Sequence, residues 1–483
     1  MTISRIVTPG ICLALMAVSV LYPSRRAVSQ SVGDERVLVL HMDQKDIDSG
    51  HERLKDLFNF GEFLFTAKFT VNDGFGRPGA TGNGVPTHRA IGSAPLMNRA
   101  SGMDANSCSG CHNDPAPGGG GDFVNSVFVL GQLADPVLES IDPQFSNERN
   151  TLGMFGSGPI ESLAVEMTTE LIAIRESAKQ SAAANHKDVT KPLVTKGVSF
   201  GEVTAHPDGT FDNSRIEGVD TDLIIKPFHQ KGVVNSLRVF SNNAYNHHHG
   251  MEAVERFGKA QTGTDDFDGD GIKDELSVGD ITAATLYQAA LPVPKQVMPR
   301  NPAEREMVKR GEKLFDQVAC TSCHRPALIL NSPMFTEPNP YNPPGNLRLA
   351  DVPRPFQFDM TKDGPGHRLE RISGGRAVVR AYTDLKRHRI TDDLDPFFAN
   401  EKLVQSGVPL NVFLTRKLWD CGNSAPYGHR GDCTTIMEAI IHHAGEARLS
   451  HDKFVALKKS QQQDVIAFLK SLVVDPRFDG PDN

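Results

Sequence analysis

The sequence predicts a mainly α-helical fold with extensive loops, built from two related halves. The segment Gly-Glu-x-Leu-Phe occurs twice inside a helical pattern of apolar residues, at 61–65 and at 311–315. A Cys-x-x-Cys-His pentad follows each copy. Strand patterns are short and scattered, and 43 glycines with 31 prolines in 483 residues predict many loops. These observations favour two or three domains organised around the pentads.

The two pentads use four of the seven cysteines and predict two covalently attached c-type haems. In such a pentad both thiols form thioethers to the porphyrin, and the histidine is the proximal ligand of the iron. A thioredoxin-like redox pair or half of a zinc site would not require a histidine directly after both copies. The fold class is therefore expected to comprise two cytochrome c-like haem domains, attached through Cys108, Cys111, His112, Cys320, Cys323 and His324.

The N-terminus has the pattern of a cleaved signal peptide. A basic residue in 1–5 precedes a short apolar run at 11–21 and small residues at 27–30. A membrane anchor would need a longer apolar run. The mature protein is thus expected to be periplasmic or secreted, without a membrane span. The expected divisions are a signal peptide at 1–29, an N-terminal haem domain at 30–235, a connecting segment at 236–300, and a C-terminal haem domain at 301–483.

Two helices are expected to frame the second pentad. A helix over about 303–318, with Pro302 at its start, leads directly into Cys320. A final helix with a capping box at 460–463 is expected to pack against it. In the first half, a glycine-rich segment that begins at 73–79 comes between helix and pentad. It either covers a cofactor or is a surface insertion.

The remaining cysteines and the net charge limit the chemistry further. Once the signal peptide and the haem cysteines are set aside, only Cys421 and Cys433 remain, and an exported chain favours a disulfide between them over two free thiols. A formal net charge of −8 argues against general binding to nucleic acid or to anionic membranes.

Alternating carboxylates surround a glycine turn within the connecting segment. Such hard oxygen ligands on one side of a tight loop suit Ca²⁺, and the spacing matches the first half of an EF-hand loop. Ser277 stands where an EF-hand has its bidentate glutamate, so Asp274 or Glu275 would have to complete the shell. The alternative is a solvated acidic turn. The expected calcium residues are Asp266, Asp268, Asp270, Ile272, Asp274 and Glu275.

Three segments carry a resemblance to a known family. They are 106–122, which contains the first pentad and a run of four glycines, 381–388, and 427–446. Through them the chain resembles the di-haem oxidoreductase family. This family is related to bacterial di-haem cytochrome c peroxidases and to the di-haem enzyme that matures methylamine dehydrogenase. The resemblance covers most of the mature chain.

The resemblance implies a distal ligand for the C-terminal haem. In the peroxidase relatives, a Tyr-x-His-x-Gly turn is followed, fourteen residues after its histidine, by a methionine ligand. The turn 427–431 matches, and the corresponding position is His443. Imidazole in place of thioether is expected to lower the reduction potential of this six-coordinate haem, because methionine raises it. His442 is the rival in another helix register, and both could instead be surface histidines.

The resemblance also implies a reaction centre at the N-terminal haem. Cleavage of a peroxide O–O bond needs an acid-base group close to the bound oxygens. Glu161 and Glu166, after a Gly-Pro pair, both fit the relatives' pattern, and both could be ordinary helix carboxylates. The chain lacks the relatives' removable histidine ligand shortly after His112 and their inter-haem tryptophan in the first half. The single Trp419 lies between the haems or in the core, and 247–249 is a distal-ligand or metal candidate or a polar loop.

The expected function is therefore that of a peroxidase-type oxidoreductase. Hydrogen peroxide or another small oxidant would bind at the N-terminal haem. The C-terminal haem would relay electrons from a small redox protein such as a cytochrome c or a cupredoxin. The alternatives are a di-haem oxidase that modifies a protein or organic substrate, and a non-catalytic di-haem electron-transfer protein. In the last case both iron positions of the N-terminal haem would be filled by protein ligands.

Overall fold

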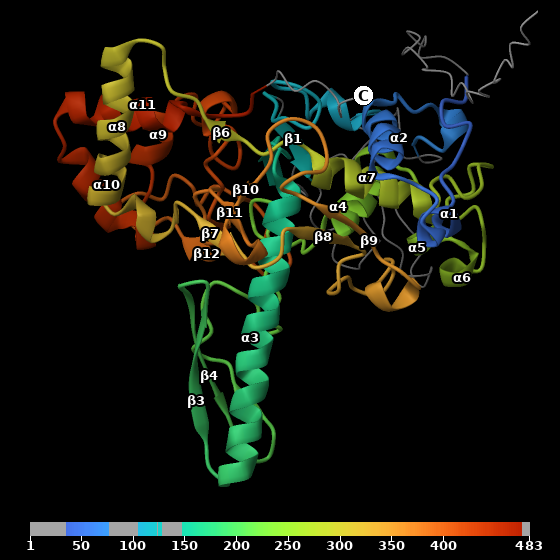
Figure 1. Ribbon diagram of the computed structural model, residues 1–483, viewed down its shortest axis with the longest axis horizontal. Helices are drawn as coiled ribbons and strands as arrows, with labels where there is room; N and C mark the ends of the chain where they lie inside the picture. Colours follow the sequence, from blue (N-terminus) through green and yellow to red (C-terminus); the bar gives the residue numbers. More distant parts are fainter. Residues whose placement is uncertain (1–34, 77–104, 123, 128–146, 476–483) are drawn as a thin grey trace, which may run out of the picture.

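The computed structural model describes residues 35–76, 105–122, 124–127 and 147–475 (Figure 1). The expected signal peptide and most of the glycine-rich segment after residue 76 lie outside these residues. Within the described ranges, no helix combines the length and the apolarity that crossing a membrane requires.

Helices and small sheets alternate along the chain. The α-helices of the described part are α1 (Gln44–Ser49), α2 (Leu54–Thr66), α3 (Ser157–Asn185), α4 (Leu237–Ala244), α5 (Val254–Phe257), α6 (Lys259–Thr262), α7 (Val278–Ala290), α8 (Pro302–Gln317), α9 (Ile436–Ile441), α10 (Arg448–Val455) and α11 (Lys459–Lys470). The strands are β1 (Val124–Val127), β2 (Asn147–Asn150), β3 (Val189–Thr195), β4 (Val198–Ala205), β5 (Phe211–Asp212), β6 (Lys295–Gln296), β7 (Leu328–Leu330), β8 (Met334–Glu337), β9 (Phe356–Asp359), β10 (Glu370–Arg371), β11 (Ala377–Val379), β12 (Arg387–Arg389), β13 (Val412–Leu414) and β14 (Leu472–Val473). The sheets are antiparallel, in the orders β1-β2, β3-β4-β5, β8-β9, β10-β11-β7, β12-β13 and β14-β6.

The expectation of a mainly α-helical fold with two cytochrome c-like domains is wrong. In the part of the chain that the structure describes, 37% of the residues are helical and 15% are in strands, the strand residues are spread over several small sheets, and no cytochrome c-like domain is seen. Most of the strands are two to four residues long, too short to show the alternation by which a strand is recognised. The segments that were expected to be loops therefore contain most of the sheet.

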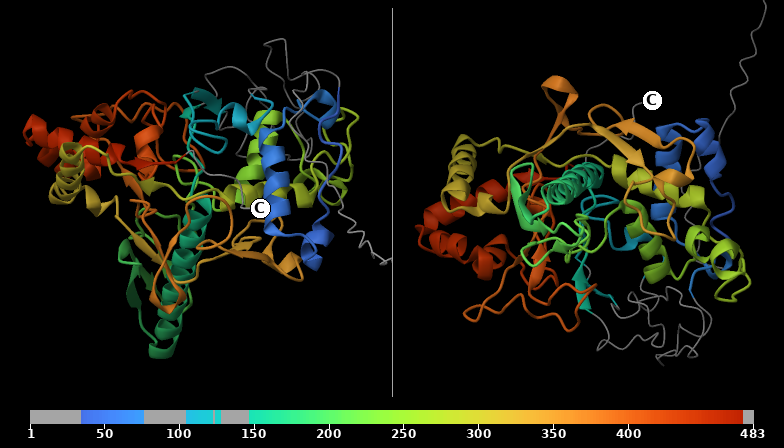
Figure 2. Two further views of the ribbon diagram at one scale, coloured as in Figure 1. Left: turned by 45° about the horizontal axis from the view of Figure 1, so that its top comes forward. Right: turned by 90° about the horizontal axis from the view of Figure 1, so that it is seen from below.

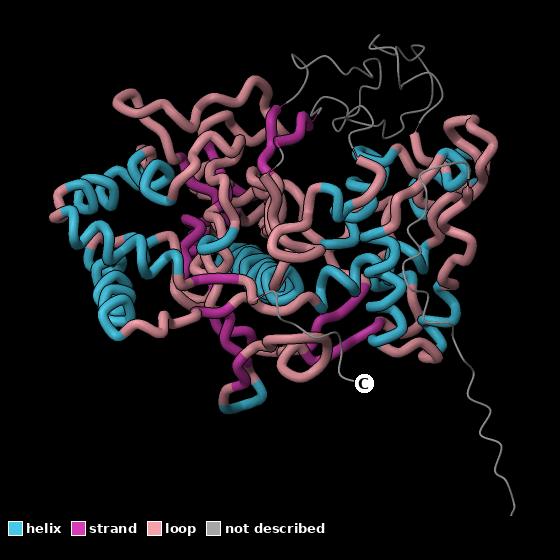
Figure 3. Tube along the Cα trace, turned by 90° about the horizontal axis from the view of Figure 1, so that it is seen from above, coloured by secondary structure: helices cyan, strands magenta, loops and turns pink. Residues whose placement is uncertain are grey.

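A long helix separates two groups of helices. One group contains α8 to α11 and the other contains α1, α2 and α4 to α7, with the N-terminal part of α3 between them (Figures 1 and 2). Figure 3 looks along α3 and shows it at the centre of the molecule. The far end of α3 projects from the body together with the hairpin β3–β4, whose register runs from Val189↔Ala205 to Thr195↔Val198.

Two helix pairs are packed closely through glycines. In α2, a Cβ at Gly61 would lie 2.2 Å from the backbone oxygen of Ala283 in α7. In α8, a Cβ at Gly311 would lie 1.9 Å from the backbone oxygen of Asp464 in α11.

The predicted packing of the last helix against the helix before Cys320 is confirmed. The helix start is displaced, since Gln461 rather than Gln463 accepts the capping hydrogen bond, from the Lys458 N–H at 3.1 Å.

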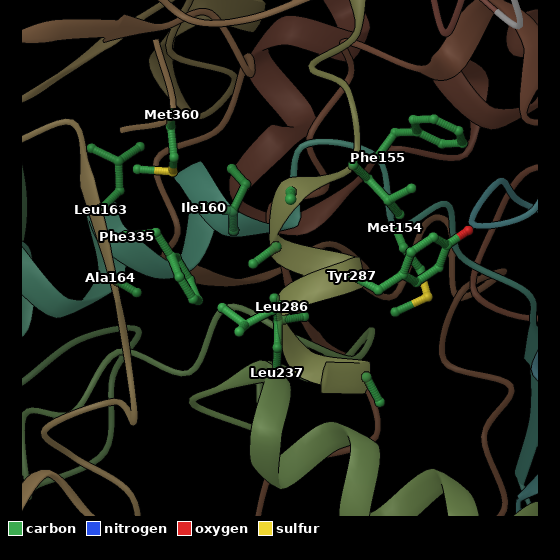
Figure 4. Packing of buried hydrophobic residues seen from close by; sticks show 14 of the residues in the cluster. Met154, Phe155, Ile160, Leu163, Ala164, Leu237, Leu286, Tyr287, Phe335 and Met360 are labelled. Atoms are coloured by element: carbon green, nitrogen blue, oxygen red, sulfur yellow. The ribbon is translucent and has the colours of Figure 1, made fainter. Parts of the chain in front are cut away.

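The largest hydrophobic core lies where α3, α4 and α7 meet (Figure 4). Ile160 and Leu163 of α3 and Leu286 of α7 are at most 2% exposed. Nearly every residue of α7 is buried, because other elements surround it on all sides. This core fixes the walls of the site described next.

Candidate haem and metal sites

Both pentads line one continuous cavity of about 420 Å³. Each pentad begins with a single 3-10 turn, η2 (Cys108–Gly110) in the first half and η6 (Cys320–Ser322) in the second. The thiols and the following imidazoles of both pentads face this common space. The cavity therefore presents two complete sets of the groups that attach a c-type haem.

The imidazoles of the pentads have the tautomer that iron ligation requires. His112 Nδ1 lies 2.9 Å from the backbone oxygen of Leu152, and His324 Nδ1 lies 3.0 Å from that of Tyr382. A carbonyl oxygen only accepts hydrogen bonds, so Nδ1 carries the proton and Nε2 keeps its lone pair for a metal. Burial lowers the pKa of both histidines to about 4. The donor set thus fits two haems.

The loop that follows the first pentad orients His112. Gly119 and Gly121 lie against backbone, since a Cβ at Gly119 would be 2.0 Å from the Asp114 oxygen and one at Gly121 would be 2.1 Å from the Cys111 oxygen. The Gly119 oxygen also lies 3.3 Å from His112 Nδ1. The glycine run therefore folds back tightly under the pentad.

The structure distinguishes the two neighbouring histidines that follow α9. His443 lines the cavity, and its Nδ1 lies 2.7 Å from the Ala439 oxygen, which again leaves Nε2 for a metal. Its proximity contributes to the lowered pKa of His324. His442 instead stacks on Phe397, with ring centroids 3.7 Å apart, and its Nδ1 lies 3.1 Å from an Asp395 carboxylate oxygen. The geometry brings His443 and His324 together.

The wall of the N-terminal part of the cavity is the helix α4 with its extension η5 (Tyr245–His249), a π-helical turn. π-Helical turns are frequent at functional sites. The residues of this wall that face the cavity recur three and four positions apart: Leu237, Phe240, Ser241, Ala244, Tyr245, His248 and His249. Of the cluster 247–249, the structure therefore places two histidines at the cavity.

Glu161 lies directly behind this wall. It is 1% exposed and accepts hydrogen bonds from the Leu237 N–H and from the Asn339 side chain, both at 2.7 Å. Burial, with a contribution from the nearby Glu337, raises the pKa of Glu161 to about 8. Glu161 itself does not line the cavity, but its neighbours Ile160 and Leu237 do.

Glu166 points to a different part of the molecule. It follows Glu161 by five positions, which places the two side chains on different faces of α3. Its carboxylate pairs with Lys196 at 2.5 Å and accepts the N–H groups of Asn331 and Ser332 at 3.0 and 2.9 Å. It is not among the residues that line the cavity.

The acidic loop forms two overlapping clusters of potential ligands. Asp266, Asp268 and Asp270 form one cluster, in which the ligand atoms lie within 4.8 Å of one another. Asp268 forms a second cluster with Glu275 and with Glu252, which lies outside the predicted loop. Burial raises the pKa of Glu275 well above its usual value, and Glu252 adds to this effect. The predicted Ile272 and Asp274 line a small cavity next to these carboxylates.

The predicted disulfide between Cys421 and Cys433 is not formed. Both are free thiols, and they belong to different buried clusters. The Cys421 thiol donates to the Leu469 oxygen at 3.2 Å. Tyr427 separates the two thiols, since it bonds the backbone of Cys433 at 2.7 Å and the Cys421 oxygen through its hydroxyl at 2.7 Å.

Trp419 is a core residue in this structure. It is 1% exposed and does not line the cavity, although Leu418 and Asp420 on either side of it do. A Cβ at Gly156 would lie 2.2 Å from the indole ring. Gly156 has φ 72, a conformation that glycine adopts without strain, so the chain can pass close to the ring at the start of α3.

Several residues of the cavity wall belong to no sequence pattern that would have predicted them. His229 has φ 64, which is unusual for a residue with a side chain, and such strain is often found at functional sites. Burial and the nearby Arg149 lower the pKa of His229 to about 3. Arg149, Gln288 and Arg416 also line the cavity. These three residues and His229 come from four separate segments of the chain, and they meet only in the folded protein.

A comparison with known protein families matches a segment of the C-terminal half that contains neither pentad. The family model described as "Di-haem oxidoreductase, putative peroxidase" matches residues 367–472, which include the turn at Tyr427 and His443. The match confirms the predicted resemblance and supports a di-haem oxidoreductase at the level of the family.

Two further comparisons add no evidence on function. No match was found among curated proteins. Among solved structures, the chain is similar to hydrazine synthase from Kuenenia stuttgartiensis, with 17% identity over 57% of this chain and 78% of that chain, at a TM-score of 0.25. A score this low carries no argument about fold or function.

Proposed function

We propose that the chain is an exported di-haem c-type cytochrome that reduces hydrogen peroxide at its N-terminal haem. A small redox protein, a cytochrome c or a cupredoxin, supplies the electrons through the C-terminal haem. One observation carries the proposal: both pentads line one cavity with their histidines in the ligating tautomer, whereas the opposite walls differ. Bound haem supplies the redox chemistry that cleaves the O–O bond. Reduction of one peroxide to two waters takes two electrons and two protons.

The C-terminal half is assigned to electron transfer. His324 and His443 both line the cavity, and each bonds a backbone oxygen through Nδ1, so both would have Nε2 available to hold a haem iron. If both imidazoles bound the iron, they would leave no position at the metal for a substrate in this half. Peroxide reduction therefore belongs to the N-terminal half.

Glu161 is assigned as the group that holds the proton. Its raised pKa keeps a large share of the carboxyl protonated at neutral pH, as a general acid requires. It also accepts the N–H of Leu237, whose side chain lines the cavity. Glu166 is held by Lys196 and two backbone N–H groups away from the cavity, which favours a structural role.

Apolar wall residues favour a second candidate function. Ile160, Phe228, Leu237 and Phe240 line the N-terminal part of the cavity, and such walls bind organic molecules. On this alternative, the same two haem sites oxidise an apolar organic substrate that enters beside α4.

Calcium is proposed as a further cofactor. Asp266, Asp268 and Asp270 bring three carboxylates together in a loop of the EF-hand type, and oxygen ligands of this kind suit Ca²⁺. Glu275 supplies the carboxylate that Ser277 cannot.

Donor-dependent peroxide turnover tests the proposed function. The holoprotein is mixed with a reduced small cytochrome c and hydrogen peroxide, and oxidation of the donor is followed optically. Two donors oxidised per peroxide consumed is the expected result. Peroxide-dependent loss of an apolar substrate without donor oxidation would favour the second candidate. Donor oxidation that is independent of peroxide would indicate an electron-transfer protein and contradict the proposal.

A further inference from the structure

A carboxylate from outside the acidic loop reaches the proposed calcium site. Glu252 lies fourteen positions before Asp266 in the sequence, yet its ligand oxygen lies within 4.8 Å of those of Asp268 and Glu275. Asp268 is shared between this group and the Asp266–Asp270 group. The two groups are therefore parts of one site with five carboxylates.

Glu275 provides independent evidence for a cation. It is 2% exposed, and its Oε2 accepts the Glu252 N–H at 2.6 Å. Its Oε1 is buried and has no hydrogen-bond partner among the described residues. Burying a carboxylate oxygen without a partner is costly, and a second carboxylate close by adds repulsion. A cavity of about 10 Å³, lined by Glu252 and Glu275 among others, lies at this point. This is about the space of one water-sized particle.

We infer that Glu252 is a ligand of this Ca²⁺ and that the ion thereby fixes the wall of the N-terminal haem cavity. The inference rests on the calcium site proposed above. Ca²⁺ takes six to eight oxygen ligands, so a shell that joins two segments of the chain is chemically reasonable.

The backbone connects the ion to the cavity wall. Glu252 follows η5, whose last residue is His249, by three positions. The His249 oxygen accepts the Gly76 N–H at 2.8 Å, and the Glu252 oxygen accepts the Leu276 N–H at 3.3 Å. The Val254 N–H donates in turn to the Leu276 oxygen at 2.9 Å. Cation binding to Glu252 and Glu275 therefore holds the end of η5 against the acidic loop.

Calcium titration of the chelator-treated holoprotein tests the ligand assignment. The wild-type chain is expected to bind Ca²⁺ at one site by calorimetry. E252Q is expected to bind it at least about tenfold more weakly, because a charged ligand is lost. The control is E306Q, which makes the same change at an exposed glutamate of α8 that pairs with Lys309. E306Q is expected to bind Ca²⁺ like the wild-type chain.

Hydrogen exchange of the wild-type holoprotein tests the effect on the wall without any variant. Calcium removal is expected to speed exchange at 245–249, while exchange in α11 stays unchanged. No calcium binding by the wild-type chain would overturn the calcium site and the inference together. The inference alone would be overturned if E252Q bound calcium as tightly as the wild-type chain. It would also be overturned if calcium removal left the rate of hydrogen exchange at 245–249 unchanged. None of these outcomes depends on peroxide turnover, so the proposed reaction is tested separately.

Discussion

The two halves hold their pentad histidines through the same kinds of contact, but different residues line the cavity opposite each histidine. In each half a glycine brings two helices into close contact, α2 with α7 and α8 with α11. The phenylalanine four residues later lies beside the pentad histidine, with ring centroids 6.1 Å apart for Phe65 and 6.3 Å for Phe315. Each histidine then bonds a backbone oxygen through Nδ1. The same arrangement of glycine contact, phenylalanine ring and Nδ1 hydrogen bond therefore supports the pentad histidine in both halves.

The opposite walls explain how this repeated arrangement can have different roles. In the second half, His443 lines the cavity together with His324 and offers a second imidazole. In the first half, the wall is α4 with η5, which combines apolar residues with Ser241, His248 and His249, and the His249 Nε2 lies 3.4 Å from the Cys108 sulfur. Under the proposed function, the repeated histidine contacts would define a haem site in each half, and the opposite wall would decide whether that site transfers electrons or accepts a substrate.

Removing both thiols of one pentad should have the largest effect, which is on the number of attached haems. The double substitution C320A/C323A is expected to leave one covalently attached haem per chain instead of two, because no thiol remains to form the thioethers. The pyridine haemochrome spectrum measures this directly. The control C421A removes a thiol that lies outside both pentads and should retain both haems. Two haems in the double variant would show that the second pentad is not an attachment site.

The proton-holding group of the first half is the next most sensitive position. E161Q is expected to lower peroxide turnover by about 100-fold, which is typical for loss of a general acid. Wild-type activity should decline as pH rises through about 8, where Glu161 loses its proton, and this decline should be absent in E161Q. E166Q is the matched control and should stay within about twofold of wild type. Equal activity of all three chains would remove Glu161 from the reaction.

Glu161 also has a consequence for stability. Its pKa rises from about 4.5 in the unfolded chain to about 8 in the folded chain, so the unfolded chain loses this proton first as pH increases. The stability contributed by the protonated carboxyl is complete below about pH 4.5 and is lost as pH rises towards 8. Denaturant unfolding between pH 5 and pH 8 should therefore show a steeper decline for wild type than for E161Q. Parallel curves would contradict the raised pKa.

The glycine contacts of α2 and α8 should make smaller contributions to the free energy of unfolding, and these contributions should be equal in the two halves. G61A and G311A are each expected to lower the free energy of unfolding by about 1–3 kcal/mol, because the added Cβ meets backbone oxygens that cannot move aside easily. Denaturant titration of the holoprotein measures the change. K309A, at an exposed position of α8, should change it by less than about 0.5 kcal/mol. If the glycine variants behave like K309A, the helix crossings are not tight.

The smallest effect is expected next to the proposed axial ligand. H442Q removes a ring that stacks on Phe397 and pairs with Asp395 at the surface. It should cost less than about 1 kcal/mol of stability and leave the visible spectrum of both haems unchanged. A changed spectrum in H442Q would mean that the register of α9 differs from the one described.

Local patterns predicted the parts of the site that lie close together in sequence. The pentads and the helix before Cys320 could be read from spacing, because each depends on one short segment, whereas His443 was implied by the resemblance to the di-haem family. The EF-hand-like spacing likewise led to Asp266, Asp268 and Asp270, which the structure groups within 4.8 Å.

Long-range features could not be predicted in this way. The acceptors of the pentad histidines are backbone oxygens, 40 and 58 residues away, and a carbonyl group has no sequence signature. The partner of α2 is α7, which is buried on all sides and therefore shows no apolar stripe. Glu252 and His229 reach their sites only through the tertiary fold. The disulfide was inferred from the number of cysteines, which says nothing about the distance between Cys421 and Cys433.

The electron paramagnetic resonance spectrum of the oxidised holoprotein, compared between wild type and H443A, tests the difference between the two halves most directly. We expect wild type to show a low-spin signal from the C-terminal haem, because two imidazoles bind its iron, and a separate high-spin signal that hydrogen peroxide converts. H443A should lose the low-spin signal and keep the peroxide-sensitive one. A low-spin signal that survives in H443A, or two low-spin signals in wild type that peroxide does not change, would contradict the assignment of electron transfer to one half and of the reaction to the other.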